Sequence, residues 1–296
     1  MFYWEQAREF YESSKTLGSI SAPLTLYYCF LNAIKALLEY NNVAVGPFHG
    51  TSGRTTTKKA TLSGELVKFG AKGVAPALAN LLGDKDARDS YTLKQILYNL
   101  PFIHRAYTIT FAKQPELFIP LREFHYVRKA GATESWILLS LDIKSDPQQI
   151  TGLLPRGYER DIAWPEHYLV RTKQRFKWRD GDNNIQSNLV RISNYNKKIR
   201  QDIKYIRGQP TTWYLKLNRN SPDVISRSTL SLMLSAMHRL SELSRYNPVR
   251  LKLLLETQQN WLISEFIGSA PLQFLDEIAT EMTGQNLAFP FVRLST

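Results

Sequence analysis

Apolar positions at helical spacing dominate the first hundred residues. Trp4, Ala7 and Phe10 recur every three or four positions, which predicts one amphipathic helix near the N-terminus. Residues 24–38, LTLYYCFLNAIKALL, are apolar around most of the helical circumference, as in a helix buried among other elements. Proline in its first turn, at Pro23, fits this start. Two shorter helices are predicted at 74–82 and 92–100, so residues 1–103 form a helical part.

The pattern changes between residues 104 and 218. Segments rich in β-branched and aromatic residues predict strands there; they are 106–111, 124–128, 135–141, 175–178, 188–192 and 212–217. The turn-forming cluster Asp180–Asn183 suggests a hairpin joining the fourth and fifth segments. We expect a mostly antiparallel sheet in this middle part.

Helices return from residue 219 to the end. Ser221, Pro222 and Asp223 form a helix-start pattern, with a capping hydroxyl, a proline and an early acid. Leucines at helical spacing then continue to Asn247-Pro248, and further helices are expected over 249–266 and 272–282. The predicted fold class is α+β. N-terminal helices (1–103) and C-terminal helices (219–296) pack as a bundle, with a β-rich middle part (104–218) between them in sequence.

The buried helix leads into HGTSGRTTTKK, residues 49–59, the strongest candidate site. Glycines allow close backbone approach to a ligand, and Arg54 can fork onto phosphate or carboxylate. His49 titrates near neutrality and can act as acid, base or hydrogen-bond donor. The candidate catalytic residues are His49 and Arg54, and the candidate anion-binding residues are Ser52, Arg54, Lys58 and Lys59. The alternative is that His49 packs against the bundle and the lysines form a solvated loop.

A second candidate is the basic run from residue 156 to 207. Thirteen lysines and arginines oppose six acids there, leaving +7 of the chain's net +12. In Arg175-Phe-Lys-Trp-Arg179, strand alternation places Arg175, Lys177 and Arg179 on one face and the aromatics on the other. Cations with exposed aromatics suit single-stranded nucleic acid. The alternative is a solvated basic sheet whose aromatics are core.

The composition of the chain limits which classes of protein and which kinds of site remain possible. Hydrophobic residues make up 43% of the chain and aromatics 12%, which favours an ordered globule. Cys29 is the single cysteine, so it forms no intrachain disulfide, and no histidine has a partner at metal-ligand spacing. We therefore predict no metal and no cofactor. The charged start MFYWEQAREF and the short apolar helix predict a soluble cytoplasmic protein that has no membrane partner.

The order of these motifs resembles the YaaC-like family of bacterial proteins. That family's pattern has an N-terminal tryptophan helix, a helix ending in Lys-Ala-Leu and an HG-x-[ST]-x-x-R-like loop. The matching residues here are Trp4, Leu26–Tyr28, Ile34–Leu38, His49-Gly50 with Ser52 and Arg54, Leu97–Pro101, Leu234-Ser235, Ser244–Pro248 and Trp261. The resemblance implies the helical architecture at both ends and leaves the activity open.

A weaker similarity concerns Arg160 and His167. Their spacing is similar to the arginine–polar–x–histidine motif of HEPN ribonucleases, which are helical bundles that carry both residues on one helix. Here Trp164-Pro165 would break such a helix, in a part of the chain that predicts strands. His49 together with Arg54 or Arg245 would supply the same chemistry from the bundle.

Two functions from different classes follow. The first is a non-catalytic protein of a bacterial cytoplasmic system, with defence as one setting, that binds an anion or nucleic acid through Ser52, Arg54, Lys58, Lys59, Arg175, Lys177, Arg179 and Arg245. The alternative is a metal-independent, HEPN-like ribonuclease or another nucleotide-directed enzyme. The expected partners are nucleic acid, a nucleotide or another protein.

Overall fold

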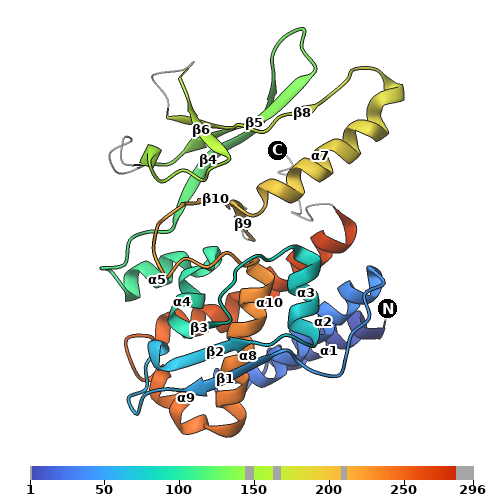
Figure 1. Cartoon of the computed structure of the whole chain (residues 1–296). Helices are drawn as coiled ribbons and strands as arrows, with labels where there is room; N and C mark the ends of the chain where they lie inside the picture. The colour runs from blue at the N-terminus through green and yellow to red at the C-terminus, as the bar shows by residue number, and fades with distance from the viewer. Residues whose placement is uncertain (1, 144–149, 163–167, 208–211, 285–296) are drawn as a thin grey trace, which may run out of the picture. The chain divides into compact units, whose positions relative to one another are not determined.

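The chain folds into two units (Figure 1). The structure is a computed structural model and describes residues 2–143, 150–162, 168–207 and 212–284. One unit combines both ends of the chain, Met1–Pro115 and Ser221–Thr296, and is called the terminal unit here. Glu116–Asn220 form the other, the inserted unit. The two stretches of the terminal unit are therefore neighbours in space although about a hundred residues separate them in sequence.

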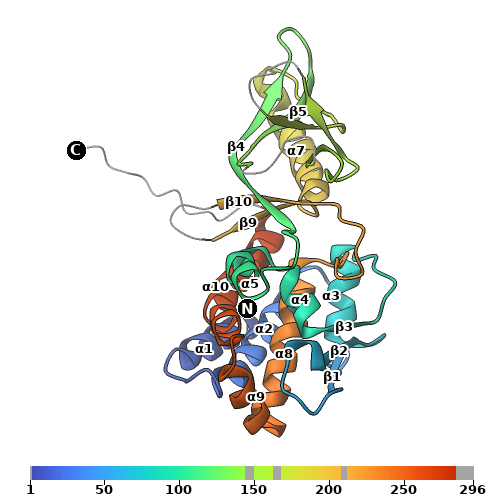
Figure 2. The same cartoon turned by 90° about the vertical axis from the view of Figure 1, so that its left-hand side faces the viewer.

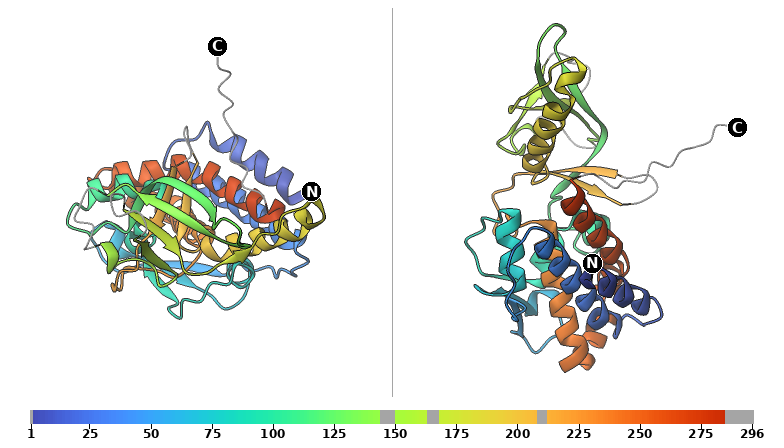
Figure 3. Two further views of the ribbon diagram at one scale, coloured as in Figure 1. Left: turned by 90° about the horizontal axis from the view of Figure 1, so that it is seen from above. Right: turned by 90° about the vertical axis from the view of Figure 1, so that its right-hand side faces the viewer.

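Helices from both ends of the chain build the terminal unit. Figure 3 shows the blue N-terminal helices beside the orange and red C-terminal ones. The helices are α1 (Phe2–Ser14), α2 (Ala22–Tyr40), α3 (Val74–Leu82), α4 (Leu93–Tyr98), α5 (His104–Thr110), α8 (Thr229–Tyr246), α9 (Pro248–Leu255) and α10 (Asn260–Thr283), with 3-10 turns at Leu62–Gly64 and Pro101–Ile103. Helix α2 packs against α1, α3, α8 and α10.

Helices α2 and α8 form the centre of this unit because nearly every side of each is buried. In α2, Phe30 stacks on Phe274 of α10 with ring centroids 3.9 Å apart. Helix α8 begins where the Ser228 side chain accepts a hydrogen bond from Ser231 N, a standard N-cap. Burying each large apolar side chain stabilises the fold by roughly 1.5–3 kcal/mol. The predicted bundle of terminal helices is confirmed.

A small antiparallel sheet lies against α8 in the same unit. Its strands, in the order β1-β2-β3, are β1 (Thr51–Thr55), β2 (Glu65–Phe69) and β3 (Ser90–Thr92). Thr51 pairs with Phe69 and Thr55 with Glu65. The sequence predicted only helices and a loop in residues 1–103, which was wrong for these strands. The segment TSGRT is polar and lacks the apolar alternation by which a strand is recognised.

The inserted unit is an antiparallel sheet with one long helix. Its strand order is β6-β7-β5-β4-β10-β9, and β8 also pairs with β5. The elements are β4 (Phe118–Arg128), β5 (Glu134–Leu141), β6 (Tyr158–Asp161), β7 (Leu169–Thr172), β8 (Phe176–Lys177), β9 (Ile203–Ile206), β10 (Thr212–Lys216), α7 (Ile185–Ile199) and a 3-10 turn at Asp182–Asn184. Helix α7 lies along the sheet (Figure 2), and its Tyr195 and Ile199 join the core formed with Ile137 and Leu139.

Two predicted strands are helices instead. Residues 106–111 fall mostly in α5, whose Ala106 and Tyr107 are buried beside α10. Residues 188–192 belong to α7, so no hairpin forms at Asp180–Asn183. In both cases burial at helical spacing overrides the β propensity of the side chains. The α+β class and the antiparallel sheet are nevertheless confirmed.

None of the helices in the described ranges is long and apolar enough to cross a membrane.

Candidate functional site

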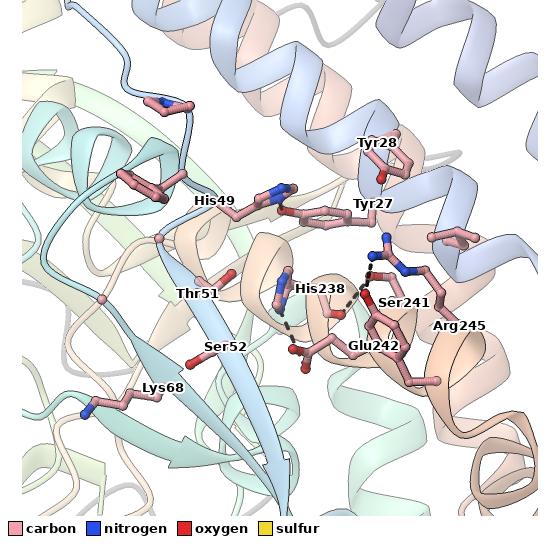
Figure 4. A pocket seen from close by; sticks show the side chains of 16 residues that line it. Tyr27, Tyr28, His49, Thr51, Ser52, Lys68, His238, Ser241, Glu242 and Arg245 are labelled. Atoms are coloured by element: carbon pink, nitrogen blue, oxygen red, sulfur yellow. Dashed lines mark hydrogen bonds and ion pairs between the residues drawn. The ribbon is translucent and has the colours of Figure 1, made fainter.

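A pocket of about 610 Å³ opens in the terminal unit around the HG segment (Figure 4). The start of α2, the residues before β1, strands β1 and β2, and the C-terminal half of α8 surround it. Its lining is Leu24, Tyr27, Tyr28, Pro47, Phe48, His49, Gly50, Thr51, Ser52, Lys68, Gly70, His238, Ser241, Glu242, Arg245 and Tyr246. The predicted site and the last turns of α8 therefore meet in one cavity.

The backbone of the HG segment is held by the start of α3. The Phe48 carbonyl accepts a hydrogen bond from Val74 N at 2.9 Å, and the His49 carbonyl accepts one from Ala75 N at 3.0 Å. Gly50 has φ +80°, and a Cβ there would lie 2.3 Å from Pro76 Cδ. Only glycine fits this conformation and this approach. Gly50 thus fixes His49 at the pocket by letting the chain run close to α3.

Tyr27 of α2 sets the proton position on His49. The Tyr27 hydroxyl hydrogen-bonds to His49 Nδ1, and the two rings stack with centroids 5.4 Å apart. Burial raises the pKa of Tyr27 far above its usual value, with smaller contributions from Tyr28 and Glu242, so the phenol keeps its proton and can donate it to His49 Nδ1. In that arrangement His49 Nδ1 is the acceptor and the ring proton lies on Nε2.

His49 is uncharged near pH 7. Desolvation lowers its pKa below the ordinary value, and the positive charges of Lys35 and Arg245 lower it further. The ring still lies at an exposed position, so its Nε2–H is a neutral hydrogen-bond donor at the pocket. A bound anion would reverse the charge effect and raise this pKa.

His238 and Glu242 lie one helical turn apart on α8. His238 is only 8% exposed and packs edge-to-face on Tyr27, with centroids 4.9 Å apart. Its Nδ1 lies 3.9 Å from Glu242 Oε2, too far for a hydrogen bond. Burial lowers the pKa of His238 to about 4; Glu242 opposes this shift, and His49 and two arginines add to it. His238 is therefore a second neutral imidazole in the pocket.

A buried ion network lies behind these residues. Glu65 of β2 is fully buried and accepts from Arg239 Nη2 at 2.6 Å and from Arg250 Nε. Arg239 Nη1 also donates to Glu242 Oε2 at 2.8 Å. The charge of Glu242 is thus matched by Arg239 and does not cancel that of Arg245, whose guanidinium lies 4.5 Å from the Tyr246 ring centroid.

Gly53 lets β1 approach α8 closely. Its N–H donates to Glu242 Oε1 at 3.2 Å, and a Cβ at this position would lie 2.2 Å from Glu242 Oε2 and 2.4 Å from Arg239 Cδ. The strand can therefore contact the ion network only without a side chain at residue 53.

The predicted site residues divide into two groups. His49, Ser52 and Arg245 line the pocket, although the Ser52 side chain points away from His238 in Figure 4. Arg54, Lys58 and Lys59 are exposed and are not lining residues, so the structure does not bring the pair His49 and Arg54 together there. The Lys58 and Lys59 carbonyls accept hydrogen bonds from Arg250, both at 3.0 Å.

Sequence reasoning missed Tyr27, Glu65, His238, Arg239 and Glu242. A usable pattern was present: His238, Arg239 and Glu242 are titratable positions at i, i+1 and i+4 in a helix that carries leucines at helical spacing. Charged residues are rarely buried unless they are paired, so this triplet indicated a partner on another element.

The basic residues of the inserted unit have a different environment. Phe176 is 8% exposed in the core beside Tyr195, and Trp178 packs partly against the same core. Lys177 and Arg179 are exposed, while the Arg175 guanidinium lies 4.1 Å from the Trp136 ring centroid. The predicted alternation is therefore seen at Phe176 and Lys177. Phe176, one of the aromatics that the sequence offered for base stacking, is therefore a core residue.

Of the two residues with HEPN-like spacing, Arg160 and His167, the structure describes only Arg160. Arg160 lies on strand β6, with its guanidinium 5.2 Å from the Tyr168 ring centroid, and not on a helix. His167 is outside the described residues. In the part of the chain that the structure describes, no three His, Cys, Asp or Glu residues are grouped as metal ligands.

A family model described as YaaC-like Protein matches residues 1–282. The chain belongs to the YaaC-like family. The match covers the pocket, the ion network and the whole inserted unit of this YaaC-like chain. Searches of curated proteins and of solved structures found no match. The family predicted from the tryptophan helix and the HG loop is therefore confirmed.

Proposed function

We propose that this YaaC-like protein binds a small phosphate-bearing ligand of the nucleotide class in the His49 pocket. One arrangement carries the proposal. Tyr27 holds His49 with its Nε2 proton available, and the guanidinium of Arg245 lines the same cavity. A neutral donor beside a cation suits a phosphate, because the phosphate oxygens accept from both. Glu242 does not cancel this preference, since Arg239 already balances its charge.

The size and the rings of the pocket support a nucleotide over a bare anion. A volume of about 610 Å³ is within the usual range for small-molecule sites. Phe48 and Tyr246 line the pocket while remaining 64% and 70% exposed. Exposed aromatic rings give a base a stacking surface, and such stacking tolerates any base. The Arg245 cation, the His49 donor and the exposed aromatic rings together suit a ligand in which a phosphate is attached to a heterocyclic base.

The proposal is tested by calorimetric titration of AMP and of inorganic phosphate. We expect AMP to bind more tightly than phosphate, and His49→Gln and Arg245→Gln each to weaken AMP binding by about tenfold, the effect of one lost charge-assisted hydrogen bond. Arg54→Gln is the matched control, because it removes an exposed arginine outside the pocket. Equal weakening by Arg54→Gln, or no AMP binding at millimolar concentration, would contradict the proposal.

Acid–base chemistry on a phosphoester is a second candidate. The observation that favours it is the pair of imidazoles, with ring centroids 6.2 Å apart and both pKa values lowered. Two neutral histidines at one cavity can take and return protons without a metal. This candidate predicts RNA cleavage in the presence of a chelator, lost in a folded His49→Gln variant. Cleavage by that variant at the wild-type rate would exclude His49 as the catalytic group.

A further inference from the structure

Two residues that line the pocket each have a buried polar atom without a hydrogen-bond partner. Within the described residues, Thr51 Oγ1 and His238 Nδ1 are both inaccessible to solvent and unpaired, and both side chains line this cavity. Buried polar groups are nearly always satisfied, so an unsatisfied one calls for an explanation. Two of them in one pocket indicate that a ligand group completes their hydrogen bonding.

The neighbouring carboxylate identifies the kind of group. Glu242 Oε2 lies 3.9 Å from His238 Nδ1, close enough for one small polar group to bond both. An ionised carboxylate only accepts, so the ligand group must donate a hydrogen bond to it. A phosphate oxygen is repelled at this position. A hydroxyl fits either tautomer of His238, because it can donate to Glu242 while accepting from or donating to the imidazole.

The pocket therefore offers two chemically different sets of groups. His49 and Arg245 offer a donor and a cation, whereas Thr51, His238 and Glu242 offer acceptors and hydroxyl-compatible groups. Figure 4 shows His49 and Arg245 on either side of the Tyr27 ring, with Thr51, His238 and Glu242 below it in this view. A phosphate joined to a hydroxyl-bearing sugar carries both kinds of group at a short distance.

We infer that Thr51, His238 and Glu242 form a subsite for sugar hydroxyls, so that the ligand is a ribonucleotide and not a deoxyribonucleotide. This inference rests on the proposed nucleotide site and adds the identity of the sugar. A site built to hydrogen-bond a hydroxyl discriminates strongly against an analogue that lacks it, because the buried polar atoms are left unpaired. A purely structural His238 would give no such discrimination.

The experiment compares AMP, 2′-deoxy-AMP and 3′-deoxy-AMP, and the three corresponding nucleosides, by calorimetry on the full chain. We expect AMP to bind about 10- to 100-fold more tightly than 2′-deoxy-AMP. Discrimination against 3′-deoxy-AMP alone would overturn the assignment to a ribonucleotide. His238→Phe keeps an aromatic ring against Tyr27 and removes the nitrogen, and Thr51→Val keeps the shape and removes the hydroxyl. Either variant, if folded by circular dichroism, should lower AMP affinity and leave affinity for the deoxy analogue unchanged. Two variants on different elements keep the test decisive if one does not fold.

The outcomes separate this inference from the function on which it rests. Equal binding of AMP and both deoxy analogues would overturn the sugar subsite and leave the nucleotide site intact. Discrimination that persists unchanged in both variants would also overturn it, since other atoms would then recognise the hydroxyls. A His238-dependent preference for adenosine over its deoxy forms, with no gain from the phosphate, would support the subsite and reject the anion site. Absence of binding by every nucleoside and nucleotide would reject both.

Discussion

Two groups of paired charges, one in each unit, differ in how far they are buried. In the terminal unit, Glu65, Arg239 and Arg250 are at most 7% exposed and contact one another. In the inserted unit, the ion pair of Arg122 with Asp142 has side chains that are 66% and 34% exposed. The longest basic run of the sequence belongs to the inserted unit. The number of basic residues therefore favours a site in the inserted unit, whereas burial and geometry favour the pocket of the terminal unit.

The comparison teaches that a buried ion network is evidence of positioning more than of stability. Removing a charge from water costs several kcal/mol, and the attraction within a well-oriented ion pair does little more than offset this cost. The Glu65 network fixes the positions of neighbouring groups. Arg239 holds the Glu242 carboxylate at the pocket, and Arg250 holds the Lys58 and Lys59 carbonyls. The Arg122–Asp142 pair of the inserted unit lies at the surface, where solvent screens its charges. The following substitutions test this difference in order of expected size.

The largest effect is expected from Glu65→Gln. The substitution keeps the shape of the side chain and removes the charge that both buried arginines contact, leaving Arg250 without its carboxylate partner in this network. Leaving a buried charge without its partner destabilises a protein by about 3–5 kcal/mol. The free energy of unfolding, measured by urea titration, should fall by that amount.

Asp142→Asn in the inserted unit is the matched control. It removes the acid of an exposed pair whose Arg122 Nη2 lies 2.8 Å from Asp142 Oδ1. Exposed pairs contribute about 0–1 kcal/mol, so unfolding should change by no more than that. Similar losses from the two substitutions would remove the distinction between the units.

The second effect is a pH dependence that originates in the terminal unit. The pKa of His238 is lowered to about 4 in the folded chain, whereas an unfolded histidine titrates near 6.5. Between these values the unfolded state binds more protons, so stability is complete above about pH 6.5 and decreases as the pH falls toward 4. The lowered pKa of His49 acts in the same direction. His238 alone accounts for a loss of order 3 kcal/mol at most.

His238→Phe should flatten this part of the stability profile, measured by urea titration from pH 7 to pH 4.5. His125→Gln provides the comparison from the inserted unit, because the His125 side chain is 60% exposed. That variant should keep the wild-type slope. A His238→Phe profile with the wild-type slope would show that this imidazole does not titrate differently on unfolding.

Local patterns explain what could be predicted from the sequence. The terminal helices follow from apolar spacing within single segments, and the HG segment stands out because its composition differs from the helix before it. The pocket depends on contacts that no local pattern contains: Tyr27 meets His49 across 22 positions, and Glu65 meets Arg239 across 174. The helix at residues 104–110 was misassigned because β-branched side chains there are outweighed by burial of Tyr107.

The third effect concerns the contact of β1 with α8. Gly53→Ala places a methyl group where Glu242 Oε2 and Arg239 Cδ now lie. Overpacking of this kind costs about 1–3 kcal/mol, and here it also moves the carboxylate at the pocket. Unfolding free energy and AMP affinity should both decrease. Gly157→Ala in the inserted unit has no heavy atom within 4 Å of the new Cβ and should leave AMP affinity unchanged.

The smallest effect distinguishes two buried tyrosines of the inserted unit, Tyr195 and Tyr158. The Tyr195 hydroxyl accepts a hydrogen bond from Ile137 N at 3.3 Å and contacts Thr172 Oγ1. Tyr195→Phe should lower the free energy of unfolding by about 1 kcal/mol, the net value of a buried hydrogen bond. Tyr158 is equally buried, but its hydroxyl has no hydrogen-bond partner within the described residues. Tyr158→Phe should therefore be neutral or stabilising in the same urea titration. A loss at residue 158 as large as that at 195 would mean that buried polar atoms here need no specific partner, and would weaken the inference drawn from Thr51 and His238.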